Sequence, residues 1–242
     1  MGDREPRRRH VLRELREIEG LSPECERAAL ILERAHGSAD AILEAFELVR
    51  RQRGNPRGVL TDNEQDLLRA MLVMAAAGLD SMIKQLIRDA LPRLARGDET
   101  VREELEKFIS RSIRGDPALA EPANAAKFLA RVLTADSPQG KVIEEYIREL
   151  TGGSLQSASE LNRVAAALGV QALRLDQNAL REIFDVRNKI IHELDINLAG
   201  DRRRRHDRGV HDMTRFTTTL ITTAERVLEA VHEKLVALPA DA

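Results

Sequence analysis

The sequence predicts an all-α fold, and three features of its 242 residues support this prediction. Apolar residues recur at helical spacing along most of the chain, whereas no stretch of any length alternates as a strand does. Aromatic residues make up only 2% of the chain, so Leu, Ile, Val and Ala must build the core. Because strands favour aromatic and β-branched residues, this composition favours helices packed on helices.

The bulk composition indicates a soluble globular protein. Hydrophobic residues make up 43% of the chain and charged residues 32%. Cys25 is the single cysteine, which allows no intramolecular disulfide and is typical of a reducing compartment. The charged start, Arg7–Arg16, is not an apolar leader, and no apolar run approaches the roughly 18 residues of a membrane span. We therefore expect a cytoplasmic protein without an export or membrane-anchoring signal.

A helical extension is expected at the N-terminus, in residues 1–58. Its three amphipathic helices are predicted at residues 6–20, 23–36 and 38–52. Ser22 and Pro23 suit the start of the second helix, as cap and first helical residue, and Gly37 is a natural stop before the third. The Gly- and Pro-rich segment 53–58 is the clearest linker in the chain.

The larger domain, residues 59–242, is predicted to open with a long central helix. Thr61 and Glu64 form a capping-box pattern, and apolar residues follow to Ile87, with bends expected near Gly78 and at Pro92. Ser157 and Asp176 are expected to cap two later helices. All the helices expected after the central one lie at about 99–113, 122–135, 139–150, 157–168, 176–195 and 210–237.

The stretch Leu180–Asp195, LREIFDVRNKIIHELD, contains a charge on its apolar face. At 100° per residue, Leu180, Ile183, Ile191 and Leu194 fall within a sector of roughly 100°, and Arg187 lies in the middle of it. A guanidinium is therefore expected where a core leucine would be usual.

Asn188, His192 and Asp195 are expected together on one flank of that apolar face. Arg, Asn and His can cleave a phosphodiester without a metal, because an imidazole can take the proton from a ribose 2'-hydroxyl or protonate the leaving 5'-oxygen. A guanidinium and an amide can bind the phosphate and stabilise its extra negative charge. Arg187 and His192 are five positions apart, about 140° around a helix, so we expect two such helices to face one another in a two-fold dimer.

Arg187-Asn188-Lys189-Ile190-Ile191-His192 resembles the motif of the HEPN superfamily, an Arg followed after four to six residues by His. The segment Gly78–Ile87 is similar to the early HEPN helix, and the resemblance covers roughly 60–238. It implies a four- to five-helix bundle that often dimerises. Many members are metal-independent endoribonucleases of toxin–antitoxin, abortive-infection or CRISPR-type defence, and others are inactive scaffolds. By resemblance, Arg187 and His192 are the catalytic pair and Asn188 is the accessory polar group, with no metal or cofactor.

This sequence departs from one branch of that family. Toxins paired with nucleotidyltransferase antitoxins carry a Tyr two residues after the motif His, where this chain has Leu194, and its one Tyr is Tyr146. The departure argues against control by modification of such a Tyr. The chain is also longer than those compact toxins, and in length it is more similar to the HEPN proteins of the RiboL-PSP-HEPN group.

The run from Asp201 to Arg208 contains five Arg and two Asp, a local charge of +3. Its consecutive arginines are expected to bind RNA phosphates, and they are Arg202, Arg203, Arg204 and Arg205. A solvated loop is the alternative, because no aromatics interleave for base stacking. The nearby His and Asp residues at 206, 207, 211 and 212 match no strong metal-ligand spacing, so no metal is expected.

Two functions remain open from the sequence. The first is a homodimeric endoribonuclease of HEPN type, a toxin or defence effector, that cuts RNA by 2'-hydroxyl attack and is controlled by an antitoxin or another defence-system protein. The second is a non-catalytic helical scaffold that binds RNA or a protein partner. In the second case Arg187 would be a structural arginine paired with an acid such as Asp80 or Glu182, and His192 a histidine favoured near a helix C-terminus by the helix dipole.

Overall fold

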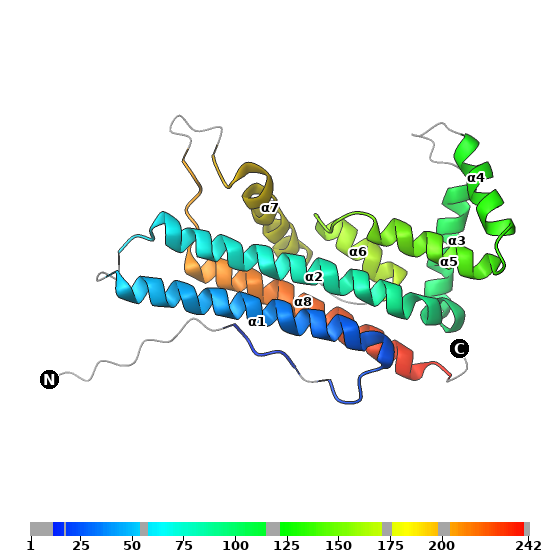
Figure 1. Cartoon of the computed structure of the whole chain (residues 1–242), viewed down its shortest axis with the longest axis horizontal. Coiled ribbons are helices and arrows are strands. Elements are labelled where there is room, and N and C mark those ends of the chain that lie inside the picture. Colours follow the sequence, from blue (N-terminus) through cyan, green and yellow to red (C-terminus); the bar gives the residue numbers. More distant parts are fainter. Residues whose placement is uncertain are drawn as a thin grey trace. The chain divides into compact units, whose positions relative to one another are not determined.

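The computed structural model describes residues 12–16, 18–53, 58–114, 122–170, 176–197 and 204–239. Within these ranges the chain forms helices and no strand, and the β-type pairing there is an isolated bridge between Ile196 and Arg205. The prediction of an all-α fold is confirmed. In chain order the helices described are α1 (Pro23–Gln52), α2 (Asp62–Gly97), α3 (Glu99–Arg114), α4 (Pro122–Leu133), α5 (Pro138–Thr151), α6 (Ala158–Ala167), α7 (Gln177–Glu193) and α8 (Val210–Ala237) (Figure 1).

Helix starts follow the local signals in the sequence. At the start of α2, the Glu64 amide donates to Thr61 Oγ1 and the Thr61 amide donates to Glu64 Oε2, which completes the capping box. Ser157 accepts a hydrogen bond from the Glu160 amide at the start of α6. Asp176 accepts from two amides at the start of α7. Each cap satisfies amides that a helix leaves unpaired, so the predicted starts are confirmed.

Two predictions for the N-terminal residues were wrong. The predicted helix at 6–20 does not form in its described part, where residues 12–16 are non-helical and residues 19 and 20 form a turn. The imidazole of His36 instead hydrogen-bonds to the carbonyl of Arg13, and Leu12 is buried. The predicted break at Gly37 is also missing, because α1 runs unbroken from Pro23 to Gln52.

Contacts divide the chain into two compact units. The first unit takes its described residues from Met1–Arg16, Leu32–Leu79 and Asp176–Thr223, and the second from Glu17–Ile31, Asp80–Leu175 and Ala224–Ala242. Each unit therefore contains residues from both sides of residue 58. The separate extension at 1–58 stays a prediction.

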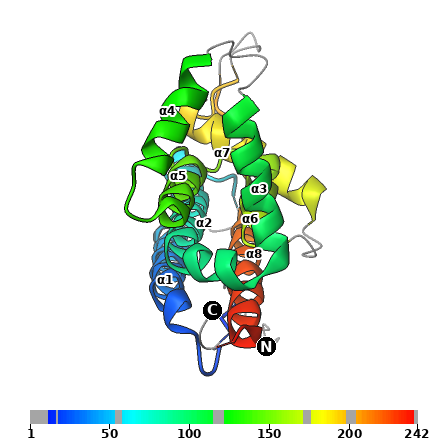
Figure 2. The same cartoon turned by 90° about the vertical axis from the view of Figure 1, so that its right-hand side faces the viewer.

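In the first unit, parts of α1, α2 and α8 lie side by side (Figures 1 and 2). Helices α1 and α2 come close together at Gly78, where a Cβ would lie 2.2 Å from the Cβ of Ala35. Only a residue without a side chain allows the two helices to come so near. Gly78 therefore sets their spacing, and α2 continues through it as a helix.

In the second unit, α3, α4 and α5 contact one another (Figure 2), and each contributes one ring to an aromatic cluster. The ring of Phe108 stacks on Tyr146 at 4.7 Å between centroids and meets Phe128 edge-on at 5.9 Å. Burial first, and then the charge of Glu104, raises the pKa of Tyr146 to about 12. All six aromatic residues of the chain are buried, so none of them is available on the surface to stack on a base.

Helix α2 is long and apolar enough to cross a membrane by length and composition alone. Of its most apolar window, 56% is buried inside the fold. The same properties describe a core helix, and α2 contributes many of the largest fully buried side chains of the described part. Its composition is therefore weak support for a membrane span.

Candidate nucleic-acid site at the end of α7

The motif residues Arg187, Asn188 and His192 lie in the last two turns of α7. Arg187 and Asn188 are half-buried, whereas the side chain of His192 is exposed. Arg187 lies on the buried face of the helix, near Ile183 and Ile190 in the helical register. The prediction that a guanidinium occupies the apolar face is confirmed.

Arg187 has no carboxylate partner among the described residues. Its Nη1 donates to Asn188 Oδ1 at 2.9 Å, and its Nε is buried without a hydrogen-bond partner. The acids expected for a purely structural arginine are engaged elsewhere: Asp80 accepts from Lys84 and from the Leu155 amide, and Glu182 lies 3.4 Å from Arg215. A partly buried guanidinium that meets no carboxylate among the described residues keeps its charge available for an anion.

His192 likewise makes no hydrogen bond or ion pair with a described residue, and it lies on the solvent side of the last turn. Five residues of helix separate it from Arg187 by about 140° and about 7.5 Å along the axis. The two side chains of one chain therefore point to different sides of α7. One helix alone does not bring both to the same phosphate.

Two predictions about the face of α7 were wrong at its C-terminal end. Ile191 and Leu194 were expected in the buried stripe, but they are 39% and 65% exposed. Asp195 was expected on a flank with Asn188 and His192, but it lies beyond the helix and is fully buried. Because α7 ends at Glu193, the helical projection no longer applies to Leu194 and Asp195, whereas Ile191 lies within the last turn of the helix and is exposed there.

The chain leaves α7 through two consecutive left-handed residues, Leu194 with φ 50° and Asp195 with φ 59°. The amides of Leu194 and Asp195 both donate to the carbonyl of Lys189, which closes the helix end. Left-handed backbone costs an L-residue roughly 1–2 kcal/mol. Interactions further along the chain must hold this turn.

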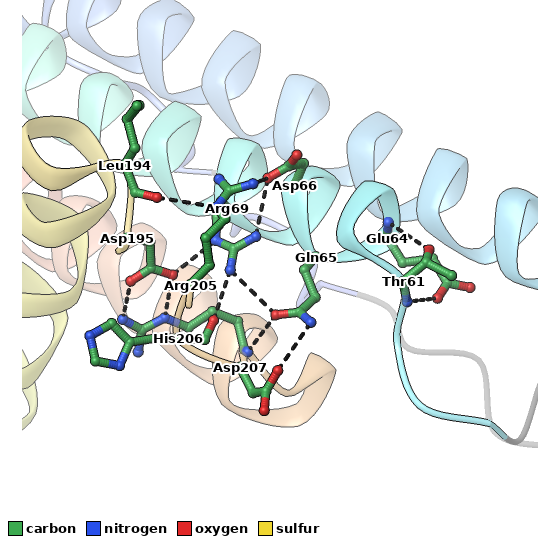
Figure 3. Close-up of polar contacts among 11 residues, drawn as sticks. Thr61, Glu64, Gln65, Asp66, Arg69, Leu194, Asp195, Arg205, His206 and Asp207 are labelled. Atoms are coloured by element: carbon green, nitrogen blue, oxygen red, sulfur yellow. Dashed lines mark hydrogen bonds and ion pairs between the residues drawn. The ribbon is translucent and has the colours of Figure 1, made fainter. Parts of the chain in front are cut away.

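Asp195 supplies those interactions by pointing toward α2 (Figure 3). Arg69 Nε donates to Asp195 Oδ2 at 2.9 Å, and Arg208 donates to both carboxylate oxygens, with 2.9 Å from its Nε to Oδ2. Burial alone raises the pKa of the Asp195 carboxyl, but the hydrogen bonds from Arg208 and Arg69 outweigh burial and hold it below its ordinary value. We call Asp195, Arg69 and Arg208 the Asp195 clamp.

Further contacts tie the clamp to its surroundings. Arg69 also donates to the carbonyl of His206 at 2.8 Å, and Gln65 accepts from the Arg208 amide at 2.9 Å (Figure 3). The His206 amide donates to the carbonyl of Asp195 at 2.8 Å. The segments 195–197 and 204–208 are thereby held together and against α2.

The predicted phosphate-binding arginines differ in their surroundings. Arg202 and Arg203 lie outside the described residues. Arg204 is exposed, and its side chain makes no hydrogen bond or ion pair with a described residue. Arg205 is engaged in the fold instead, with Asp66 at 2.6 Å and the carbonyl of Leu194 at 3.1 Å.

The acidic and imidazole groups near the start of α8 do not converge. Asp207 lies 3.4 Å from the amide nitrogen of Gln65, and His211 lies 3.8 Å from Asp212 beside Arg215. Among the residues described, no three His, Cys, Asp or Glu side chains are grouped as a metal site would require.

Sequence reasoning missed Arg69 and the role of Asp195. A signal for Arg69 is present, because Arg69 lies on the apolar stripe of α2 with Leu68, Leu72 and Ala76. A charge at such a position requires a buried partner. The partner itself is 126 residues away, so local spacing does not identify it.

The chain matches no protein-family description, no curated protein and no solved structure.

Proposed function

We propose that this chain is a metal-independent endoribonuclease of HEPN type, a cytoplasmic toxin or defence effector that cuts RNA at a site shared by two copies. The observation that carries the proposal is the state of the motif on α7. Arg187 is partly buried without a carboxylate partner in the described residues, and His192 is exposed one turn further on. A cation without a carboxylate partner among the described residues, on the same helix as an accessible imidazole, suits a phosphodiester substrate bound between two copies.

In the proposed reaction, the ribose 2'-oxygen attacks the adjacent phosphorus and the bond to the 5'-oxygen breaks. His192 takes the 2'-hydroxyl proton, and an imidazole returns a proton to the leaving 5'-oxygen. Arg187 and Asn188 bind the non-bridging oxygens, whose negative charge grows in the pentacovalent state. The products are a 2',3'-cyclic phosphate end and a 5'-hydroxyl end.

A shared site follows from the angle between Arg187 and His192. Because about 140° of helix separates them, a second α7 related by a two-fold axis would place the His192 of one copy opposite the Arg187 of the other. Ile191 and Leu194, which are 39% and 65% exposed, flank His192 in sequence and supply apolar area for that interface.

RNA is proposed to reach this site by charge rather than by base stacking. Arg204 is exposed without a described partner and lies in the run that follows α7. Because every aromatic side chain is buried, binding is expected to depend on phosphates and to weaken steeply with salt. An antitoxin or another defence protein would control access to such a site.

The non-catalytic scaffold is the competing proposal, and one observation favours it. Two arginines of the basic run, Arg205 and Arg208, are engaged by Asp66 and Asp195, so part of the positive charge serves the fold. A scaffold would bind RNA or a partner protein without cutting. The two proposals differ in a single assay.

That assay incubates the purified chain with mixed RNA in excess EDTA at several salt concentrations. The enzyme proposal expects cleavage by the wild type and a loss of at least about 100-fold in His192→Ala. His211→Ala is the matched control, because His211 is a histidine on α8 with 87% of its side chain exposed. Binding without cleavage supports the scaffold, and equal cleavage by His192→Ala rejects the site.

A mixing experiment tests the shared site. Arg187→Ala and His192→Ala are each expected to be inactive alone. In a random mixture half the dimers are mixed, and with a shared site each mixed dimer would hold one intact site. Activity should therefore recover to about a quarter of the wild type if the site is shared. No recovery would place both groups in one chain and contradict the shared site.

A further inference from the structure

We infer that Asp195 is a positioning residue, which through Arg69 and Arg208 fixes the place of His192 and Arg204 relative to α2. The effect of this positioning on catalysis rests on the proposed function, whereas the positioning itself can be measured without any activity. The clamp joins three parts of the first unit: α2, the end of α7 and the segment before α8 (Figure 3).

Position along the chain is the first argument. Asp195 comes three residues after His192, and the end of α7 is closed by its amide on the carbonyl of Lys189. Arg204 enters the same assembly through its backbone, since its carbonyl accepts from the Asn197 amide at 2.8 Å. His192 is thus three residues from Asp195, and Arg204 is hydrogen-bonded to Asn197, two residues beyond Asp195, whereas neither side chain belongs to the clamp.

Backbone strain is the second argument. Leu194 and Asp195 both adopt left-handed backbone, although neither is a glycine. Such conformations persist where the surroundings over-determine them, and they concentrate at functional sites. Here the carboxylate of Asp195 is held at both oxygens, which fixes the turn that decides where α7 ends.

The type of interaction is the third argument. A buried ion pair contributes little net stability compared with an apolar replacement, because desolvation offsets the attraction. A bidentate guanidinium–carboxylate contact does fix the relative orientation of the two groups, since two parallel hydrogen bonds restrict both sliding and rotation. Three charged groups gathered here, two of them buried and the third half-buried, therefore point to a demand for fixed geometry rather than for stability alone.

The consequence for the reaction is specific. A shift of about 1 Å in a reacting group can lower a rate about 100-fold without changing how tightly the substrate binds. Loosening the clamp should therefore lower kcat by a larger factor than it raises KM, because Arg204 is one of several phosphate contacts whereas His192 takes part in the reaction. A residue that only stabilised the fold would reduce the active fraction without altering the structure around His192 in the folded molecules.

The test uses the full chain with Asp195→Asn, which keeps the shape and removes the charge. Arg208→Lys is the second variant, which keeps the positive charge and removes the bidentate guanidinium. It is expected to disturb folding less than Asp195→Asn, because 15% of the Arg208 side chain is exposed. Asp212→Asn is the matched control, at an aspartate with 61% of its side chain exposed. The measurements are the NMR signal of the His192 ring, hydrogen exchange, and kcat and KM on RNA, all at a temperature where each variant is folded.

Both clamp variants should move the His192 signal and speed exchange at least about tenfold at the amides of Asp195, Ile196 and His206, which the clamp holds. Their kcat should fall about 10- to 100-fold with KM within about threefold, and the control should match the wild type. Unchanged His192 signal and exchange would overturn the inference, as would a wild-type kcat in Asp195→Asn. A moved His192 signal in a chain whose wild type cuts no RNA would reject the proposed function and keep the positioning by Asp195.

Discussion

Replacing Asp195 by Ala should strongly destabilise the first unit. The carboxylate is fully buried, and its partners Arg69 and Arg208 have only 4% and 15% of their side chains exposed. Removing one member of a buried ion pair leaves uncompensated charge and costs about 3–5 kcal/mol. Here two guanidinium groups lose their shared partner, so the expected loss lies at the upper end of that range.

Urea unfolding at pH 7, followed by circular dichroism, measures this loss as a lower transition midpoint. Asp212→Ala is the control, because its exposed pair with Arg215 should contribute less than about 1 kcal/mol. A loss below about 1 kcal/mol in Asp195→Ala would refute the reasoning, since it would mean that the arginines find water or another acid once Asp195 is gone.

Three further predictions follow from the same contacts. The pKa of Asp195 is lowered on folding, so its contribution to the free energy of unfolding is present above the ordinary Asp pKa and is lost as the pH falls through the folded value. Urea midpoints measured against pH should therefore fall more steeply below about pH 4 in the wild type than in Asp195→Ala. Gly78→Ala should destabilise by about 1–3 kcal/mol by forcing a methyl group against Ala35, and Ala35→Gly in the same chain should restore most of the midpoint. Arg204→Ala should weaken RNA binding and reduce the slope of log affinity against log salt concentration by about one. Arg205→Ala should change that slope less, because Arg205 is paired with Asp66. Equal slopes in the two variants would contradict the proposal that Arg204 rather than Arg205 binds phosphate.

Local chemistry explains why much of the fold could be predicted from the sequence. The caps at Thr61, Ser157 and Asp176 act within three or four residues, so their partners are visible in the sequence. Helical periodicity likewise extends over a few turns, and it placed α3, α5 and α8 within a residue or so of their observed bounds.

Gly37 shows where local signals were overridden. A glycine inside a helix costs about 1 kcal/mol relative to Ala. The apolar stripe of α1 continues across it through Leu32, Ala39 and Leu43, all of which are buried. Burial of that stripe exceeds the cost of one glycine, so α1 does not break.

The candidate site was predictable in its residues but not in its surroundings. The position of Arg187 on an apolar face followed from periodicity, and the predicted face was correct at Leu180 and Ile183, which are buried. The error at Leu194 and Asp195 arose because α7 ends before them, and this end is held by a pairing with α2 that spans 126 residues. Tertiary charge pairing of this kind leaves no periodic trace in the sequence.

The most direct test of the central claim is the chemistry of the cut. Two RNAs are incubated with the wild-type chain in EDTA: an unmodified RNA, and the same RNA with a single 2'-deoxy nucleotide at a mapped cleavage position. The products of the unmodified RNA are analysed by mass spectrometry. Cleavage by 2'-hydroxyl attack predicts 2',3'-cyclic phosphate ends on the unmodified RNA, no cut at the deoxy position and no products with His192→Ala. Cleavage at the deoxy position, or ends without a cyclic phosphate, would contradict the proposed role of His192.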